Sequence, residues 1–257
     1  MRPVVFARMA RLFPLAAAFL LAAGFGAWTE TSLSGSETWE LAEASKYPDP
    51  QLVRLNIPKR YAYHTPDSSG PHKGPMYFFA FYPDFSSVTD PQNADVNPYR
   101  CPGYCNGLLI VYLENVGLHR GNTSATELFA HHYLRKRAAG DIAHDDGRST
   151  KFIEQPPKFG FDVIFDEVTT YIGKITINNK YMIKYTNDKT SYSLVAECNM
   201  YANNNKCHLI FSPQCAPEME VEVGPLEYSK MELSLDIWNR ADKFISAMIQ
   251  NDNCKPK

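Results

Sequence analysis

The chain has 257 residues, with 15 tyrosines and 15 phenylalanines spread along it, a formal net charge of −2 and a pI near 6.4. This aromatic content supports a sizeable packed core and excludes a globally disordered chain. The nearly neutral charge gives no case for a nucleic-acid partner, because proteins that bind nucleic acid usually carry a basic face.

The N-terminal segment predicts export. Arg2, Arg8 and Arg11 precede an apolar run at 12–28, and small residues lie near the end of that run. This pattern is typical of a secretory signal. The run is long for a signal and short for a membrane-spanning helix, so residues 1–28 form either a cleaved signal peptide or an N-terminal anchor. We therefore expect a protein that is periplasmic or otherwise exported, free or tethered to the inner membrane.

The polar segment 29–50 predicts a linker, with one helical turn near Trp39. Residues 51–257 then predict a single domain.

Alternating or continuous apolar runs predict strands through most of this domain. The expected strands are 52–57, 76–82, 108–114, 161–168, 171–177, 181–185, 191–198, 207–212 and 219–223. Asn178 and Asn179 predict a turn between the strands 171–177 and 181–185. Residues 139–152 predict a surface loop, which Pro156 and Pro157 follow.

Two segments predict helices. Ser124 and Glu127 have the spacing of a capping box at the start of the first, 125–138. The second, 235–249, repeats apolar residues every three or four positions, as an amphipathic helix does. Strands in runs with two main helices, one of them C-terminal, predict an α+β fold with largely antiparallel sheets.

The six cysteines all follow the apolar run and suggest disulfides in an oxidising compartment. Two β-rich runs flank a loop at 199–206, which places Cys198 opposite Cys207 in a hairpin. Cys101 and Cys105 would then close the short CPGYC loop, and elimination leaves Cys215 to hold the C-terminal tail through Cys254. Three residues separate Cys101 from Cys105, so we expect a structural staple there instead of a CxxC redox pair.

No local motif indicates a catalytic residue or a cofactor, because the chain has no GxSxG, P-loop or GxGxxG sequence. His131 and His132 precede His144, Asp145 and Asp146, which are residue types that ligate zinc. Adjacent histidines, however, point about 100° apart on a helix. We therefore expect neither a metal site nor a cofactor.

An acidic row near the last predicted strand is the clearest surface feature. Glu218, Glu220 and Glu222 would point to one face of that strand, while the apolar residues between them point to the other. Glu227 follows a little later. Such a row is either the solvated face of a sheet or a surface that binds a basic protein partner.

Several motifs, taken in order, resemble a known family. They are a strand ending in LNIPKRY, an aromatic strand that runs into YPDF, and a late VEVGPLEY followed by a helix with DIWNRADKFISAMI. After an export segment, this order is similar to that of periplasmic immunity proteins of bacterial type VI secretion systems. Many members are lipoproteins, whereas this chain has no cysteine directly after the apolar run to carry a lipid.

The resemblance implies a non-catalytic protein that occludes the active site of a cognate toxin, such as a lipase or a cell-wall hydrolase. The partner-binding residues are not fixed by sequence, although the loops 97–104 and 199–205 are rich in tyrosine and asparagine. Two alternatives stay open: a structural component of the cell envelope, and an exported hydrolase whose site forms only in the fold. A histidine within about 3 Å of a serine or carboxylate inside a cleft would favour the hydrolase.

Overall fold

The computed structural model describes most of the chain that follows the predicted export segment. The described residues are 35–42, 52–61, 63–64, 75–93, 107–116, 124, 126–127, 130–131, 134, 140, 142–143, 145–169, 175–185, 192–200, 205–251 and 254. The predicted signal peptide or anchor at 1–28 lies outside these ranges, as do Cys101 and Cys105. Within them, no helix has the length and apolar character needed to span a membrane.

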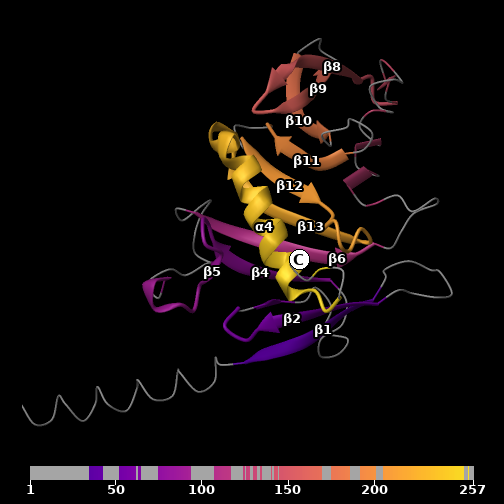
Figure 1. Ribbon diagram of the computed structural model, residues 1–257. Helices are drawn as coiled ribbons and strands as arrows, with labels where there is room; N and C mark the ends of the chain where they lie inside the picture. The colour runs from indigo at the N-terminus through magenta and orange to yellow at the C-terminus, as the bar shows by residue number, and fades with distance from the viewer. Residues whose placement is uncertain are drawn as a thin grey trace, which may run out of the picture.

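Most strands belong to one sheet in which every paired strand is antiparallel. In spatial order they are β3 (Tyr63–His64), β4 (Met76–Phe81), β6 (Leu108–Asn115), β13 (Met219–Glu227), β12 (Lys206–Phe211), β11 (Tyr192–Asn199), β10 (Ile175–Tyr185), β9 (Phe161–Thr169), β8 (Ser149–Lys158) and β7 (Ile142–Ala143), with β5 (Ser86–Ser87) beside β4. After β6 the chain continues at the far edge with β7 and returns strand by strand, until β13 pairs with β6 (Figure 1).

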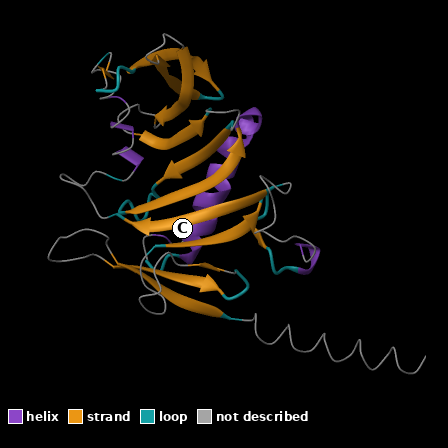
Figure 2. Ribbon diagram, turned by 180° about the vertical axis from the view of Figure 1, so that it is seen from behind, coloured by secondary structure: helices purple, strands orange, loops and turns teal. Residues whose placement is uncertain are grey.

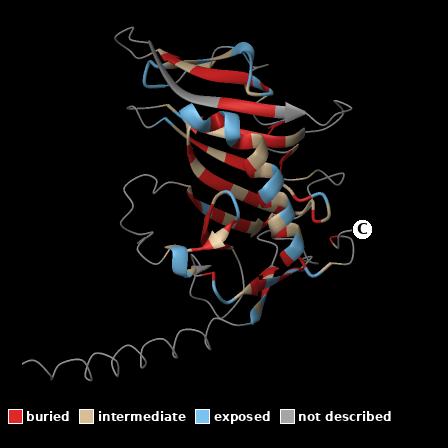
Figure 3. Cartoon of the chain, turned by 60° about the vertical axis from the view of Figure 1, so that its left-hand side comes forward, coloured by how far each residue is buried: buried red, intermediate tan, exposed pale blue. Residues whose placement is uncertain are grey.

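One face of this sheet forms the main hydrophobic core. On β6, Leu109, Val111 and Leu113 point into this core, and Val221 and Val223 of β13 lie beside them. The intervening residues point to the opposite face, because successive side chains of a strand alternate. Figure 3 shows this alternation as buried and partly buried residues along the central strands.

A C-terminal helix covers the core face. The short 3-10 helix η4 (Tyr228–Leu233) leads into α4 (Ser234–Met248), which crosses the sheet diagonally (Figure 1). Its buried residues are Ser234, Ile237, Ala241, Ile245 and Met248, at the spacing expected for one apolar stripe. Beside that stripe, the Phe244 ring centroid lies 5.2 Å from that of Phe85 and 5.4 Å from that of Tyr61.

A separate two-stranded ribbon packs beside the end of α4. It pairs β1 (Ser36–Ala42) with β2 (Leu52–Pro58), and Trp39 and Leu41 of β1 are buried in the main core. Residues 36–42 therefore correct the expected linker and helical turn: Trp39 and Leu41 alternate with polar residues, which is a strand pattern. The Asn115 Nδ2 atom donates to the Leu41 carbonyl oxygen (3.0 Å), joining ribbon and sheet.

The expected second main helix is not confirmed. In the described part of the chain, α4 is the one helix of that length, and only residues 126–127, 130–131 and 134 of the first predicted helix are described, in helical conformation. The capping box is confirmed: the Ser124 N–H donates to Glu127 Oε2 (3.1 Å), and the Glu127 N–H donates to Ser124 Oγ (3.3 Å). Ala130 and Leu134 pack on the face of the sheet opposite to α4.

Two strands differ from the sequence-based expectation. Residues 149–158 form β8, whereas the sequence predicted a surface loop up to residue 152 and a break at Pro156 and Pro157. This strand is mostly exposed and carries Pro156 and Pro157 where its register with β9 shifts, so it has little apolar signal. The other is β10, which runs unbroken through Asn178 and Asn179 with a register irregularity there, where a turn was expected.

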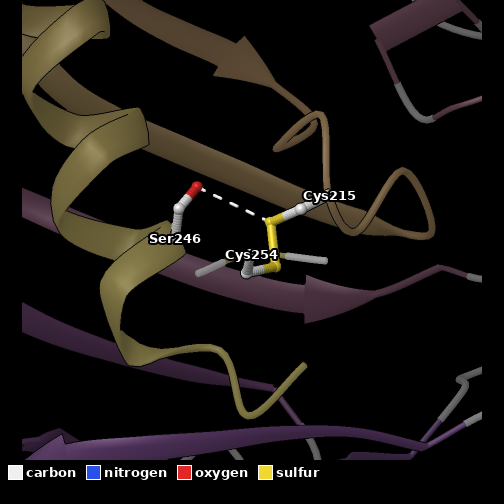
Figure 4. Close-up of a disulfide and its surroundings, with 3 residues drawn as sticks. All are labelled: Cys215, Ser246 and Cys254. Carbon is white, nitrogen blue, oxygen red and sulfur yellow. Dashed lines mark hydrogen bonds between the residues drawn. A yellow bond between two sulfur atoms is a disulfide. The ribbon is translucent and has the colours of Figure 1, made fainter. Parts of the chain in front are cut away.

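Among the described cysteines the structure has two disulfides, Cys198–Cys207 and Cys215–Cys254, both of them expected from the sequence. Cys198 and Cys207 are register partners on β11 and β12 and are buried in the main core. Cys215 and Cys254 fasten the C-terminal tail beside α4, where Cys215 Sγ lies 3.8 Å from Ser246 Oγ (Figure 4). Disulfides are typical of an oxidising, exported location.

Candidate functional site

The face of the sheet opposite to α4 carries a group of polar side chains at β6 and β13. No described helix crosses these two strands on this side, as the view from behind shows (Figure 2). Glu220 and Glu222 point to this face because Met219, Val221 and Val223 between them fill the core. Register then places Glu114 opposite Glu220 and Tyr112 opposite Glu222.

Short polar contacts connect most of this group. The Tyr112 hydroxyl donates to Glu114 Oε2 (2.9 Å). From the neighbouring strand β12, His208 Nδ1 lies 2.6 Å from Glu222 Oε1. Both partners of that pair are partly exposed, with 41% and 34% of their side-chain surface accessible, so they are within reach of a ligand or a partner protein.

Gly224 explains the position of the histidine. A Cβ atom at residue 224 would lie 2.9 Å from His208 Nδ1 and 3.1 Å from the Cys207 carbonyl oxygen. The first distance is shorter than real Cβ atoms show and the second is tight, so the imidazole occupies space that a glycine leaves open on β13. The glycine thus allows His208 to reach Glu222.

The electrostatics of the group are dominated by its carboxylates. Burial, with additional repulsion from Glu114 and Glu222, raises the pKa of Glu220 to about 7. Burial also raises the pKa of the Tyr112 hydroxyl, as do its hydrogen bond to Glu114 and the nearby negative charges. Glu220 therefore exchanges a proton near neutral pH, and a cation placed beside it would favour its charged form.

Apolar side chains border the acids. Ile110 is 38% exposed, and register places it opposite Phe79 of β4. Tyr77 lies opposite Tyr112, and its ring packs edge-on against Phe79 at 6.2 Å. We name the whole group the sheet-face patch, which consists of Tyr77, Ile110, Tyr112, Glu114, His208, Glu220 and Glu222.

The other acids of the predicted row lie elsewhere. Glu218 precedes β13 and lines a cavity at the β1–β2 ribbon. Glu227 ends β13 and pairs with Lys230 (3.7 Å). Two of the four predicted acids, Glu220 and Glu222, therefore lie in the patch. Glu218 precedes the strand, and Glu227 is its last residue.

The residues considered for metal binding are not gathered in the described part of the chain. His131 is exposed, and Asp146 pairs with Arg148 (2.6 Å). No group of three or more His, Cys, Asp or Glu residues within the described ranges is arranged to hold a metal ion. His132 and His144 lie outside those ranges.

Of the two loops considered for partner binding, one lies outside the described residues and the other is described only at its ends. Residues 97–104 lie outside the described ranges. Of 199–205, Asn199, Met200 and Asn205 are described, and Met200 packs against the main core. The Tyr228 N–H donates to the Asn205 carbonyl oxygen (2.7 Å), which fixes the end of that loop against η4.

Sequence reasoning missed five members of the sheet-face patch: Tyr77, Ile110, Tyr112, Glu114 and His208. A signal was present, since Tyr112 and Glu114 alternate with Val111 and Leu113, and His208 lies between Cys207 and Leu209. That alternation indicates the face on which each residue lies. It does not indicate that β6 and β12 flank β13.

Comparisons with known proteins return no relatives. No protein-family model, no curated protein and no solved structure matches this chain.

Proposed function

We propose that this protein is an exported, non-catalytic binding protein that uses the sheet-face patch to bind a basic surface of a protein partner. The observation that supports this most is the gathering of Glu114, Glu220 and Glu222 beside exposed Ile110. Glu114 and Glu222 repel the charged form of Glu220, so a cation placed beside Glu220 would stabilise that form.

A lysine or arginine side chain from the partner would relieve that repulsion. Complementary charge also speeds association and favours one orientation of the two proteins. Tyr77, Tyr112 and Ile110 would supply the apolar contacts that carry much of the energy in interfaces of about 1,600 Å².

We further propose that the partner is a toxin that acts outside the cytoplasm and that binding occludes its active site. The support is the resemblance of LNIPKRY, YPDF, VEVGPLEY and DIWNRADKFISAMI to periplasmic immunity proteins of type VI secretion systems. The disulfides fit an oxidising compartment. The periplasm, with or without an N-terminal membrane tether, is the location that this role requires.

The test combines binding with neutralisation. The exported chain is purified with its disulfides intact and mixed with toxins encoded beside its gene, and both affinity and residual toxin activity are measured. We expect one toxin to bind and to lose activity. The double variant Glu220→Lys and Glu222→Lys is expected to bind at least about 30-fold more weakly, because two attractive contacts become repulsive.

Glu227→Lys is the matched control, because Glu227 lies on the same strand outside the patch. It is expected to change the affinity by less than about threefold. If no neighbouring toxin binds, the immunity role is wrong. If a toxin binds and the double variant matches the control, the protein is a binder but the patch is not its interface.

The contact between His208 and Glu222 supports a second candidate, an exported hydrolase. A carboxyl group with a pKa of about 7 is suited to general acid or base catalysis at neutral pH, and Glu220 has that property. In this case the purified chain hydrolyses cell-wall or lipid-ester substrates, and Glu220→Gln lowers the rate by at least about 100-fold. The absence of hydrolysis of both substrate classes would exclude this candidate.

A further inference from the structure

A cavity of about 350 Å³ that shares no residue with the sheet-face patch lies where the β1–β2 ribbon meets the C-terminal end of α4. We name it the seam cavity, and its lining residues are Val53, Arg54, Glu218, Ile249, Gln250 and Asn251. Its volume is at the lower end of the range of small-molecule sites, roughly 300 to 1,000 Å³. The volume thus suits a small ligand.

Three chain segments that are distant in sequence form this cavity, and backbone contacts fix two of them together. Leu55 and Ile249 form an isolated antiparallel bridge. The Gln250 N–H donates to the Arg54 carbonyl oxygen (2.7 Å), and Gln250 Nε2 donates to Thr38 Oγ1 (3.4 Å). The ribbon side and the tail side of the cavity are therefore held in register.

A disulfide holds the third segment. Cys215 lies three residues before Glu218, and its partner Cys254 lies three residues after Asn251. The Cys254 N–H also donates to the Asn251 carbonyl oxygen (2.9 Å), and the Val116 N–H donates to the Glu218 carbonyl oxygen (3.0 Å). A covalent bond thus keeps both lining segments in place, so the cavity is formed before any ligand arrives.

The cavity carries opposite charges that do not neutralise each other. Arg54 pairs through Nε with Glu40 (3.1 Å) and makes no ion pair with Glu218. That contact uses one guanidinium nitrogen and leaves the two terminal nitrogens for a ligand. The Glu218 side chain has no hydrogen bond or ion pair with another described residue, although its carbonyl oxygen accepts from Val116.

We propose that the seam cavity binds a small zwitterion, namely a short peptide with free amino and carboxylate ends. The Arg54 guanidinium suits a carboxylate, and the Glu218 carboxylate suits an ammonium group. The Gln250 amide oxygen can accept from a peptide N–H group, and Val53 and Ile249 supply apolar contact. A phosphate dianion fits poorly, because Glu218 would repel it.

Binding is measured by titration calorimetry on the full exported chain with its disulfides intact. The probes are alanyl-alanine, its N-acetyl derivative, which lacks the ammonium group, and its C-terminal amide, which lacks the carboxylate. We expect alanyl-alanine to bind with a Kd of about 1 mM or lower, and each derivative to bind at least about tenfold more weakly.

Two variants connect each loss to one side chain. The Glu218→Gln variant is expected to bind alanyl-alanine and its N-acetyl derivative equally, because it lacks the carboxylate that would contact the ammonium group. The Arg54→Met variant is expected to bind alanyl-alanine and its amide equally, because it lacks the guanidinium that would contact the carboxylate. The melting temperature of each unliganded variant, matched to wild type, shows that the fold is intact.

Arg148→Met and Glu227→Gln are the controls, because they remove the same charges at ion pairs outside the cavity. Both are expected to bind alanyl-alanine as the wild type does. The proposal is overturned if alanyl-alanine does not bind, or if Arg54→Met and Glu218→Gln discriminate among the three probes as the wild type does. This test is independent of the toxin-binding test, since the seam cavity and the sheet-face patch share no residue.

Discussion

The two faces of the main sheet use the same strands in different ways. On the core face, Leu113 of β6 is fully buried between its register partners Met76 and Val221. On the other face, Ile110 of the same strand is 38% exposed, and Glu114 lies opposite a second carboxylate. The apolar side chains of the core face pack against other residues of the chain, whereas the sheet-face patch has carboxylates close together and an exposed apolar side chain. The first specifies the fold, and the second is available for binding.

The largest expected effect tests this contrast on β6 itself. Leu113→Ala is expected to lower the free energy of unfolding by about 2 to 5 kcal/mol, because it leaves a cavity in packed surroundings. Ile110→Ala is expected to cost less than about 1 kcal/mol, since part of that side chain already contacts water. Urea unfolding measures both, and equal costs would mean that the two faces do not differ as described.

A second prediction concerns the covalent link within the core face. Replacing Cys198 and Cys207 with alanine is expected to destabilise the protein by about 2 to 4 kcal/mol, because the unfolded chain loses a constraint and the core loses two buried sulfurs. Thermal unfolding with and without reductant measures this. Reductant should lower the melting temperature of the wild type more than that of the variant, and equal responses would contradict the prediction.

The third and smallest effect lies on the patch and depends on pH. Folding raises the pKa of Glu220 to about 7, so the folded protein loses stability as pH rises from near 4.5 through 7. Glu220→Gln is expected to stabilise the protein at pH 8 by on the order of 2 kcal/mol and to have little effect at pH 4. Glu227→Gln, at the exposed end of β13, serves as the control. A gain for Glu220→Gln that is the same at both pH values would contradict this origin.

Local patterns predicted the parts of the fold that depend on neighbouring residues. Alternation identified β2 and β13, continuous apolar runs identified β4 and β6, and the hairpin pattern paired Cys198 with Cys207. The capping box of Ser124 and Glu127 is equally local. β1 and β8 were missed because the first lies in a polar segment and the second carries two prolines and is mostly exposed.

The candidate site was predictable only in part, for a related reason. Alternation along one strand placed Glu220 and Glu222 on the same face. Their proximity to Glu114 and His208 depends on β6 and β12 flanking β13, although more than 100 residues separate β6 from β13 in the sequence. No pattern within a short window contains that pairing, so the sequence indicated an acidic row but not the contacts of its carboxylates with β6 and β12.

The position of β13 also determines the order in which the molecule is completed. This strand joins β4 and β6 to the meander of β7 to β12, yet residues 219–227 follow all of those strands in the chain and are synthesised after them. Until they arrive, β6 and β12 each have an unpaired edge, and neither half of the sheet can join the other. A chain that is cut before residue 219 therefore cannot close its sheet, and the two halves of the sheet join only once β13 is present.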